Sequence, residues 1–274
     1  MNWPIQLDLL DRASSVSSAD GGDILLPFAI DELLCKEVGE GREPIVHLWR
    51  HPTAFVLGLR DRRLPFALEA MESLRIMGME VGVRNSGGAA VPLDLGVVNV
   101  SVILPNPLKT LDFHQDFQYL IDLVKGGLGQ AGKMIDSGEV AGAYCPGEYD
   151  LSIRGRKFCG IAQRRQTKAY IVQGFVIAEG SGRERARRVQ DFYSQASGED
   201  GRGEGAQAGR YPVIETEYTA SLEELGIPGG SKAFIKGVSG WLQTLGKVTV
   251  LDPQSIAHDA IVPMVELLRH RYNR

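Results

Sequence analysis

The residue whose type and surroundings most strongly suggest chemistry is a cysteine in a loop. Cys145 stands directly before a Pro-Gly pair and ahead of an apolar stretch that predicts a strand, where burial is less expected than inside a strand. Lys157 follows 12 residues later, beyond a tight turn at 154–156. If the loop folds back, the ammonium of Lys157 comes near Cys145 and favours its thiolate, the nucleophilic form. The spacing therefore allows a cysteine nucleophile assisted by a lysine.

The other two cysteines predict packing. Cys159 alternates with Phe158 and Gly160 inside an apolar segment, and Cys35 lies on the apolar face of a predicted helix. Three cysteines cannot form a disulfide framework, and a chain of 274 residues can bury a sizeable core without one. The cysteine content therefore indicates a reducing compartment.

A glycine-rich segment between two apolar stretches has the composition of a ligand-binding turn. It reads RNSGGAAVPLD over 84–94 and is followed by Gly96 and Asn99. Adjacent glycines let the backbone approach a ligand closely and aim N–H groups into a cleft. The same pattern also fits an ordinary hairpin, so the residues alone leave both interpretations open.

A second glycine pattern, GLGQAG at 127–132, has the G-x-G-x-x-G form of a dinucleotide-binding turn. That site needs a strand before the glycines and a helix after them. Here the glycines follow an amphipathic helix, so they predict the end of that helix. We expect no nucleotide at this position.

A local set of basic side chains is either a solvated surface or a docking surface for an acidic protein. The set consists of Arg164, Arg165, Lys168, Arg183, Arg185, Arg187 and Arg188. Charge runs of this kind are usually solvated, and the docking hypothesis is kept for testing.

Composition argues against several classes of function. The 30 basic and 34 acidic residues give a net charge of −4, unlike a nucleic-acid-binding protein. The start of the chain shows no signal peptide, and no apolar run approaches the ~20 residues of a membrane span. The five histidines form no metal-ligand spacing, so no metal is expected. We therefore predict a cytoplasmic protein that binds neither nucleic acid nor membrane.

The segments that must position these residues alternate between helical and extended patterns. Helices are predicted at 24–34 with Asp23 as the cap, and at 65–78, 114–125, 182–196, 221–225, 231–245 and 254–272. Strands are predicted at 45–49, 54–58, 81–83, 97–104, 149–153, 157–163 and 169–178. The fold class is therefore α/β, or α+β, with mixed, largely antiparallel sheets flanked by helices. Residues 197–210 predict a flexible loop, because their largest aliphatic side chain is alanine.

Four segments carry a resemblance to a known family: LWRHPTAFVLG (48–58), RNSGGAAVPLDLGVVN (84–99), YCPGEYDLSIRGRKFCGIAQRR (144–165) and ASLEEL (220–225). Together they resemble the lipoate/biotin protein ligase superfamily. Within it, the chain is similar to the N-octanoyltransferases that use the octanoylated glycine cleavage H protein, also called lipoyl amidotransferases. The resemblance implies a ligase-like catalytic domain at 23–230, preceded by an N-terminal arm at 1–22 and followed by a C-terminal helical extension at 231–274.

The second segment departs from the ligases that use ATP. Those ligases resemble R-R-x-G-G-G-A-V-x-H-D, whereas this chain has Asn85, Ala89 and Leu93 at the second Arg, the third Gly and the His. These are positions suited to phosphate contact and adenylation. The resemblance therefore implies transfer without ATP or another cofactor. Moving an octanoyl group between two lysine amides breaks and makes the same type of bond, so no nucleotide is needed to drive it.

The resemblance also implies roles for single residues. Cys145 would form an acyl-thioester and Lys157 would tune its reactivity. Backbone N–H groups of the Gly87-Gly88 turn could hold the developing oxyanion. The substrate-binding set would be Arg84, Gly87, Gly88, Asp94, Asn99 and Gln163. The octanoylated glycine cleavage H protein would be the donor, and lipoyl domains of 2-oxoacid dehydrogenase E2 subunits would be the acceptors.

Three alternatives stay open. A close relative takes octanoate from acyl carrier protein, also through a cysteine thioester. An ATP-dependent lipoate ligase is disfavoured by the altered glycine segment and by Cys145. A non-enzymatic carrier that only binds lipoylated domains would tolerate loss of Cys145, whereas the enzyme would not. The sequence does not decide the donor, whether lipoyl is also transferred, or the oligomeric state.

Overall fold

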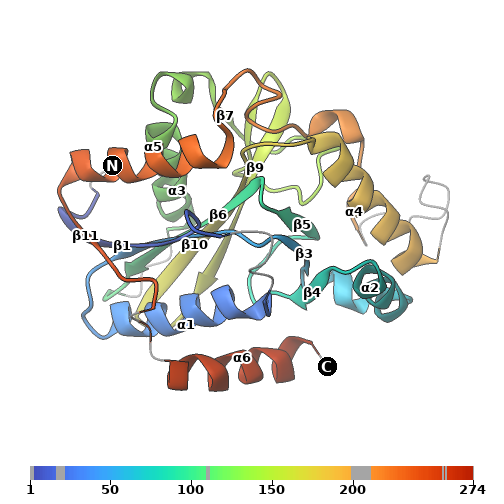
Figure 1. Ribbon diagram of the computed structural model, residues 1–274, viewed down its shortest axis with the longest axis horizontal. Helices are drawn as coiled ribbons and strands as arrows, with labels where there is room; N and C mark the ends of the chain where they lie inside the picture. Colours follow the sequence, from blue (N-terminus) through green and yellow to red (C-terminus); the bar gives the residue numbers. More distant parts are fainter. Residues whose placement is uncertain are drawn as a thin grey trace.

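The computed structural model describes residues 3–16, 22–108, 112–198, 211–254, 256 and 258–273. An eight-stranded sheet forms its centre, in the order β11-β1-β2-β6-β10-β9-β8-β7 (Figure 1). In chain order, these strands are β1 Gln6–Arg12, β2 Ile45–Trp49, β6 Val97–Pro105, β7 Asp136–Ser137, β8 Leu151–Ile153, β9 Arg156–Arg165, β10 Ala169–Ile177 and β11 Lys247–Val250. The pairings of β1 with β2 and β11 are parallel and the others are antiparallel, which confirms the predicted mixed, largely antiparallel sheet.

A smaller sheet has the order β4-β3-β5, with β3 Thr53–Leu57, β4 Glu80–Val83 and β5 Val91–Asp94. β3 pairs in parallel with β4 and antiparallel with β5. Two helices, α2 (Ala67–Ile76) and α4 (Gly182–Ser197), pack beside it and against each other, at the right of Figure 1. The segment that joins β4 to β5 is the glycine-rich turn, which therefore runs from one edge strand of this small sheet to the other.

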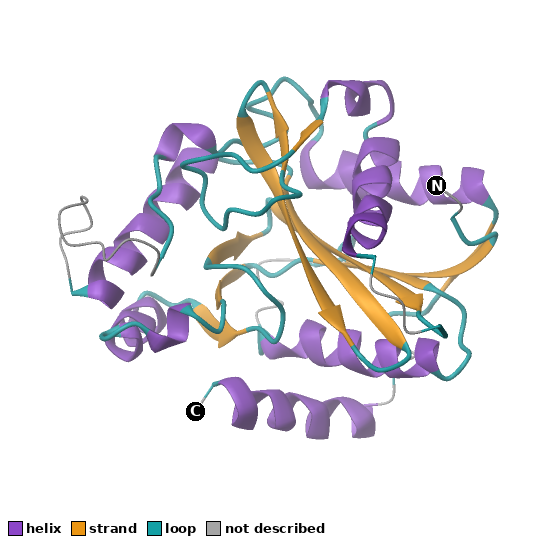
Figure 2. Cartoon of the chain, turned by 180° about the vertical axis from the view of Figure 1, so that it is seen from behind, coloured by secondary structure: helices purple, strands orange, loops and turns teal. Residues whose placement is uncertain are grey.

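Helices cover both faces of the large sheet. α1 (Leu25–Gly39) packs against β6 and β10 on one face, with α6 (His258–Tyr272) outside it. α3 (Phe113–Gly127) and α5 (Gly230–Leu245) cover the opposite face, as Figure 2 shows from behind. Because both faces are covered, consecutive residues of β6 are buried from Val97 to Leu104. Apolar cores lie on both sides of the sheet.

The helix ends follow the chemistry of their caps. Asp112 caps α3 by accepting the N–H of Gln115 at 3.0 Å, and α3 ends at Gly127. The G-x-G-x-x-G pattern therefore ends a helix, as predicted. Ser181 caps α4 by accepting the N–H of Glu184 at 3.2 Å, and Gly198 ends it in the left-handed region with φ 75°.

Several elements differ from the prediction. Residues 6–12, predicted within an arm, form β1, because its leucines face the cores while Asp8 pairs at the surface with Arg42 at 3.3 Å. The short strands β5 and β11 were not predicted, and residues 221–225 form a turn instead of a helix. The strands at 45–49 and 54–58 lie in different sheets. Most of the predicted loop at 197–210 lies outside the described residues. The three-part division of the chain stays a prediction, although its first and last parts both add a strand to the central sheet.

Among the described helices, none combines the length and apolar character needed to cross a membrane.

Candidate active site

Cys145 occupies a strained position in the loop between β7 and β8. Its φ is +49°, a region that non-glycine residues rarely adopt. Although it lies in a loop, the residue is only 8% exposed. The preceding Tyr144 stacks on Phe175 of β10 with ring centroids 5.6 Å apart, so the loop folds back over the sheet. The side chain of Cys145 is thus presented in one fixed direction.

The glycine-rich turn holds the sulfur of Cys145. The backbone N–H of Ala89 donates to Sγ at 3.3 Å, and Nη2 of Arg84 donates to Sγ at 3.6 Å. Arg84 also binds the carbonyl oxygens of Gly87 and Ala89, at 3.0 and 2.6 Å, so its guanidinium fixes the turn that carries the N–H. A guanidinium and an aimed N–H together favour negative charge on the sulfur.

Gly88 has to be a glycine in this arrangement. Its φ is +96°, and a Cβ there would lie 2.5 Å from Nη2 of Arg84 and 3.1 Å from Sγ of Cys145. Any larger side chain would push the turn away from the sulfur. The glycine-rich segment is therefore more than an ordinary hairpin turn, because it meets the predicted nucleophile.

Lys157 contacts Cys145 at the backbone. Its Nζ donates to the carbonyl oxygens of Tyr144, at 3.0 Å, and of Cys145, and forms an ion pair with Asp150 at 2.7 Å. An ammonium has three protons, so these partners account for all its donors. The sequence led us to expect the ammonium near the thiol, but the cation at the sulfur is Arg84. The loop does fold back as required, and Lys157 is the second residue of β9.

Asp150 completes the support of this loop. It accepts the N–H of Gly147 at 3.0 Å, and its side chain is 1% exposed. Burial raises the pKa of Asp150 to about 6, and the charge of Lys157 opposes that rise. The loop is thus clamped from below by a buried ion pair whose acid titrates in a mildly acidic range.

A pocket opens beside Cys145. It lies between the two sheets and beneath α1, and its walls include Arg84, Ser86, Asn99 and Cys145. The rest of the wall is largely apolar, with Phe28, Trp49, Val56, Leu93 and Phe175 contributing. The site is suited to an apolar chain whose reactive end reaches Cys145.

Two buried hydrogen-bond donors in this pocket have no partner among the described residues: Ser86 Oγ and Asn99 Nδ2. Such groups are costly to bury unless a ligand or water satisfies them. Their place beside Cys145 is suited to binding a carbonyl oxygen.

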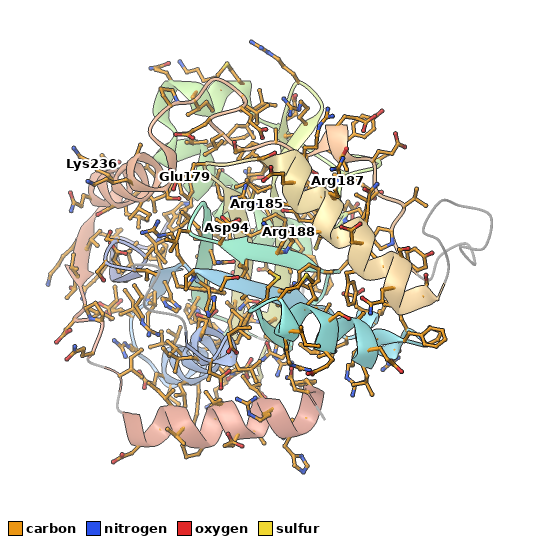
Figure 3. All side chains as sticks on the ribbon, turned by 45° about the vertical axis from the view of Figure 1, so that its right-hand side comes forward. Asp94, Glu179, Arg185, Arg187, Arg188 and Lys236 are labelled. Atoms are coloured by element: carbon orange, nitrogen blue, oxygen red, sulfur yellow. The ribbon has the colours of Figure 1, made fainter. Side chains whose placement is uncertain are left out.

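Other predicted site residues lie elsewhere. Gln163 donates from Nε2 to Asp116 of α3 at 2.8 Å and does not line the pocket, because alternation along β9 turns it to the opposite face from Ala162. Asp94 also does not line the pocket; it forms a two-bond ion pair with Arg185, at 2.5 and 2.9 Å. Figure 3 shows this pair where β5 meets α4. Gly87 and Gly88 line a separate hollow on the other side of the turn, together with Pro146.

The basic residues predicted as a docking surface fall into two groups, those paired with acidic side chains and those exposed to solvent. Arg185 is 4% exposed and paired with Asp94, so its assignment to an exposed docking surface was wrong. Arg164 pairs with Glu32 at 2.9 Å, and Arg165 pairs with Asp116. The members exposed to solvent are Lys168, Arg183, Arg187 and Arg188.

The cysteine assignments agree with the sequence. Cys159 and Cys35 are fully buried, and burial raises the pKa of both thiols, that of Cys35 to about 12. Sequence reasoning missed Ser86, Ser101 and Gln173, all of which line the pocket. For Ser101 and Gln173, the available signal was a polar residue inside an apolar strand, at 97–104 and 169–178 respectively.

Comparisons with known proteins agree with this architecture. The lipoyl protein ligase A/B catalytic domain family matches residues 23–208. An octanoyl-GcvH:protein N-octanoyltransferase of Lysinibacillus sphaericus is 40% identical over 199 residues, covering 72% of this chain and 70% of that protein. A lipoyl-GcvH:protein N-lipoyltransferase of Listeria monocytogenes is 38% identical over 173 residues, covering 63% and 62%.

A solved lipoate-protein ligase A bound with ATP shares the fold, with a TM-score of 0.66 over 98% of this chain and 96% of that one, at 17% identity. The family match covers most of the chain and agrees with the relatives. The chain therefore belongs to the lipoyl protein ligase A/B catalytic domain family.

Proposed function

We propose that this protein transfers an octanoyl group from a lysine of the octanoylated glycine cleavage H protein to a lysine of E2 lipoyl domains, through a thioester on Cys145. The observation that carries the proposal is the sulfur of Cys145, which receives N–H groups from Ala89 and Arg84 at the wall of a largely apolar pocket. The Lysinibacillus sphaericus relative is named an octanoyl-GcvH:protein N-octanoyltransferase. That name supports octanoyl as the group transferred and GcvH, the glycine cleavage H protein, as the donor.

In the first step, the thiolate of Cys145 attacks the carbonyl carbon of the octanoyl-lysine amide. The C–S bond forms, the C–N bond breaks, and the donor lysine leaves as an amine after gaining one proton. In the second step, the amine of the acceptor lysine attacks the thioester. A C–N bond forms, the C–S bond breaks, the amine releases one proton, and the sulfur leaves as the thiolate. One amide is consumed and one is made, so the cycle needs no nucleotide.

Residues around Cys145 divide this work. Arg84 and the N–H of Ala89 stabilise the thiolate before attack and after the second step. Ser86 Oγ and Asn99 Nδ2 donate to the carbonyl oxygen as it gains negative charge, which would satisfy two buried groups that otherwise lack a partner. Lys157 is a positioning residue, because it holds the backbone of Cys145.

The two hollows beside the glycine-rich turn separate the two parts of the substrate. The apolar pocket would take the acyl chain, at ~0.8 kcal/mol per buried methylene. The hollow lined by Gly87, Gly88 and Pro146 adjoins it through Ser86 and would admit the lysyl arm of the donor or acceptor protein.

The test is transfer by the full chain from octanoylated H protein to an apo lipoyl domain, with a chelator and without nucleotide. We expect the acceptor to gain one octanoyl group. Parallel reactions supply octanoyl-acyl carrier protein, lipoylated H protein, or octanoate with ATP and Mg²⁺. Efficient transfer from acyl carrier protein but not from H protein would show that acyl carrier protein, and not H protein, is the donor. A strict requirement for ATP and Mg²⁺ would make the protein a ligase and end the proposal.

A further inference from the structure

A row of three polar side chains crosses the large sheet beneath α1. His47 of β2, Ser101 of β6 and Gln173 of β10 are register partners, so their side chains share one face of the sheet. Asp31 of α1 binds all three: His47 Nδ1 at 2.8 Å, Ser101 Oγ at 2.6 Å and Gln173 Nε2 at 2.8 Å. Asp31 and Ser101 are each 1% exposed and His47 is fully buried.

This polar row forms part of the pocket that Cys145 lines. Ser101 and Gln173 belong to its wall. The next row along the same strands consists of Trp49, Asn99 and Phe175, and Phe175 carries the stacked ring of Tyr144. Ser101 and Gln173 therefore lie one row farther from the loop of Cys145, about 6.6 Å along the strands. An acyl chain attached at Cys145 would point its far end toward them.

The row presents hydrogen-bond acceptors to the pocket. The hydroxyl proton of Ser101 and the Nε2 group of Gln173 are both directed to Asp31. The atoms still able to accept a hydrogen bond are Ser101 Oγ, through its lone pairs, and Gln173 Oε1. Gln173 Oε1 is buried and has no partner among the described residues. A saturated chain pressed against these oxygens would leave them unsatisfied, whereas a hydrogen-bond donor there would satisfy them.

We propose that Ser101 and Gln173, oriented by Asp31, select the acyl group by the chemistry of its far end. They accept a medium-length acyl group that carries a hydroxyl or thiol near its terminus, and they reject saturated chains long enough to cross the row. This inference rests on the proposed function, because it takes the acyl group to be attached at Cys145. It adds a determinant of acyl specificity that is separate from the reacting atoms.

The test is a competition among three small thioesters with the full chain. Octanoyl-, 8-hydroxyoctanoyl- and decanoyl-N-acetylcysteamine are mixed in equal amounts, and intact-protein mass gives the ratio of adducts. We expect the parent to accept the 8-hydroxyoctanoyl group at least as well as octanoyl, and to disfavour decanoyl. Because the readout is a ratio within one sample, it does not depend on the fraction of active protein.

Gln173→Met keeps the length of the side chain and removes its amide, so it separates polarity from size. We expect the ratio of 8-hydroxyoctanoyl to octanoyl adduct to fall about tenfold, the size of one lost buried hydrogen bond, and the share of decanoyl to rise. Ser101→Ala is a smaller change with the same expected direction, in case the first variant folds poorly. Gln118→Met, on α3 and outside the pocket, is the matched control and should leave all ratios unchanged.

The outcomes separate this inference from the proposed function. Unchanged ratios in both variants would overturn the role of the row even if transfer proceeds normally. To test binding without acylation, the affinities of octanoic acid and 8-hydroxyoctanoic acid for the parent and the variants are measured by calorimetry. If the acids follow the predicted selectivity but Cys145 forms no adduct, the selectivity stands and the thioester fails.

Discussion

The ammonium of Lys157 donates to the backbone carbonyl of Cys145, whereas the sulfur of that residue receives its hydrogen bonds from Ala89 and Arg84. In the proposed mechanism, positioning and activation of Cys145 are thus assigned to different cations. Lys157 and Asp150 hold the loop in place from the interior, and Arg84 reaches the sulfur from the glycine-rich turn. This division of roles makes the effects of the two cations separable by experiment.

Arg84→Met should slow alkylation of Cys145 by iodoacetamide at neutral pH, on the order of tenfold, because it removes the guanidinium that favours the thiolate. The reaction is followed by intact-protein mass in a Cys35→Ala, Cys159→Ala background. Arg187→Met, at an exposed arginine of α4, is the matched control and should react at the parent rate. Equal rates for Arg84→Met and the parent would remove Arg84 from the activation of the thiol.

Lys157→Met should lower the free energy of unfolding by about 3–5 kcal/mol, since it leaves the buried carboxylate of Asp150 without its partner. Urea unfolding measures this change. The double variant Lys157→Met, Asp150→Leu should recover part of the loss, because no unpaired buried charge remains. Strictly additive losses would show that the ion pair does not couple the two residues.

The pH dependence of stability should report Asp150. Its folded pKa of about 6 lies above the ordinary 3.8, so between these values the folded protein binds a proton that the unfolded chain releases. The contribution of this group to the free energy of unfolding is therefore present below pH 4 and lost as the pH rises through 6. Asp150→Asn should flatten that part of the profile, measured by urea unfolding from pH 4 to 7. Glu148→Gln, at an exposed acid of the same loop, should leave it as in the parent.

The exposed arginines of α4 test the docking hypothesis. The double variant Arg187→Glu, Arg188→Glu should raise the KM for the protein donor and weaken its dependence on salt, with kcat unchanged. Lys236→Glu is the matched control, because Lys236 is exposed on α5, away from α4 (Figure 3). Equal KM values across a salt series for the parent and the α4 variant would make this charge an ordinary solvated surface.

Much of the fold could be predicted because its signals are local. The strands at 157–163 and 169–178 are apolar runs around a short turn, and the helix at 182–196 begins at a serine cap. β1 could not be predicted in the same way. The adjacent Leu9 and Leu10 break the alternation of apolar and polar residues, and the strand is fixed by parallel neighbours from distant parts of the chain.

In the candidate site, too, features that depend on one local segment could be predicted, and features that depend on distant residues could not. Cys145 and its proximity to Lys157 follow from a loop, a turn and a strand within one segment. The pairing of Asp94 with Arg185 joins residues 91 positions apart, so the sequence could not show that each is occupied by the other. The row of His47, Ser101 and Gln173 likewise depends on strand register and on Asp31 from another element.

The most direct test of the account is the mass of the protein after one turnover with octanoylated H protein and no acceptor. We predict a single octanoyl adduct on Cys145, sensitive to hydroxylamine as a thioester is, in the parent and in Cys159→Ala. Addition of an apo lipoyl domain should then remove the adduct as the acceptor gains the octanoyl group. Cys145→Ala should form no adduct. Transfer that continues in Cys145→Ala, or an adduct found on Cys159, would contradict the assignment of Cys145 as the nucleophile.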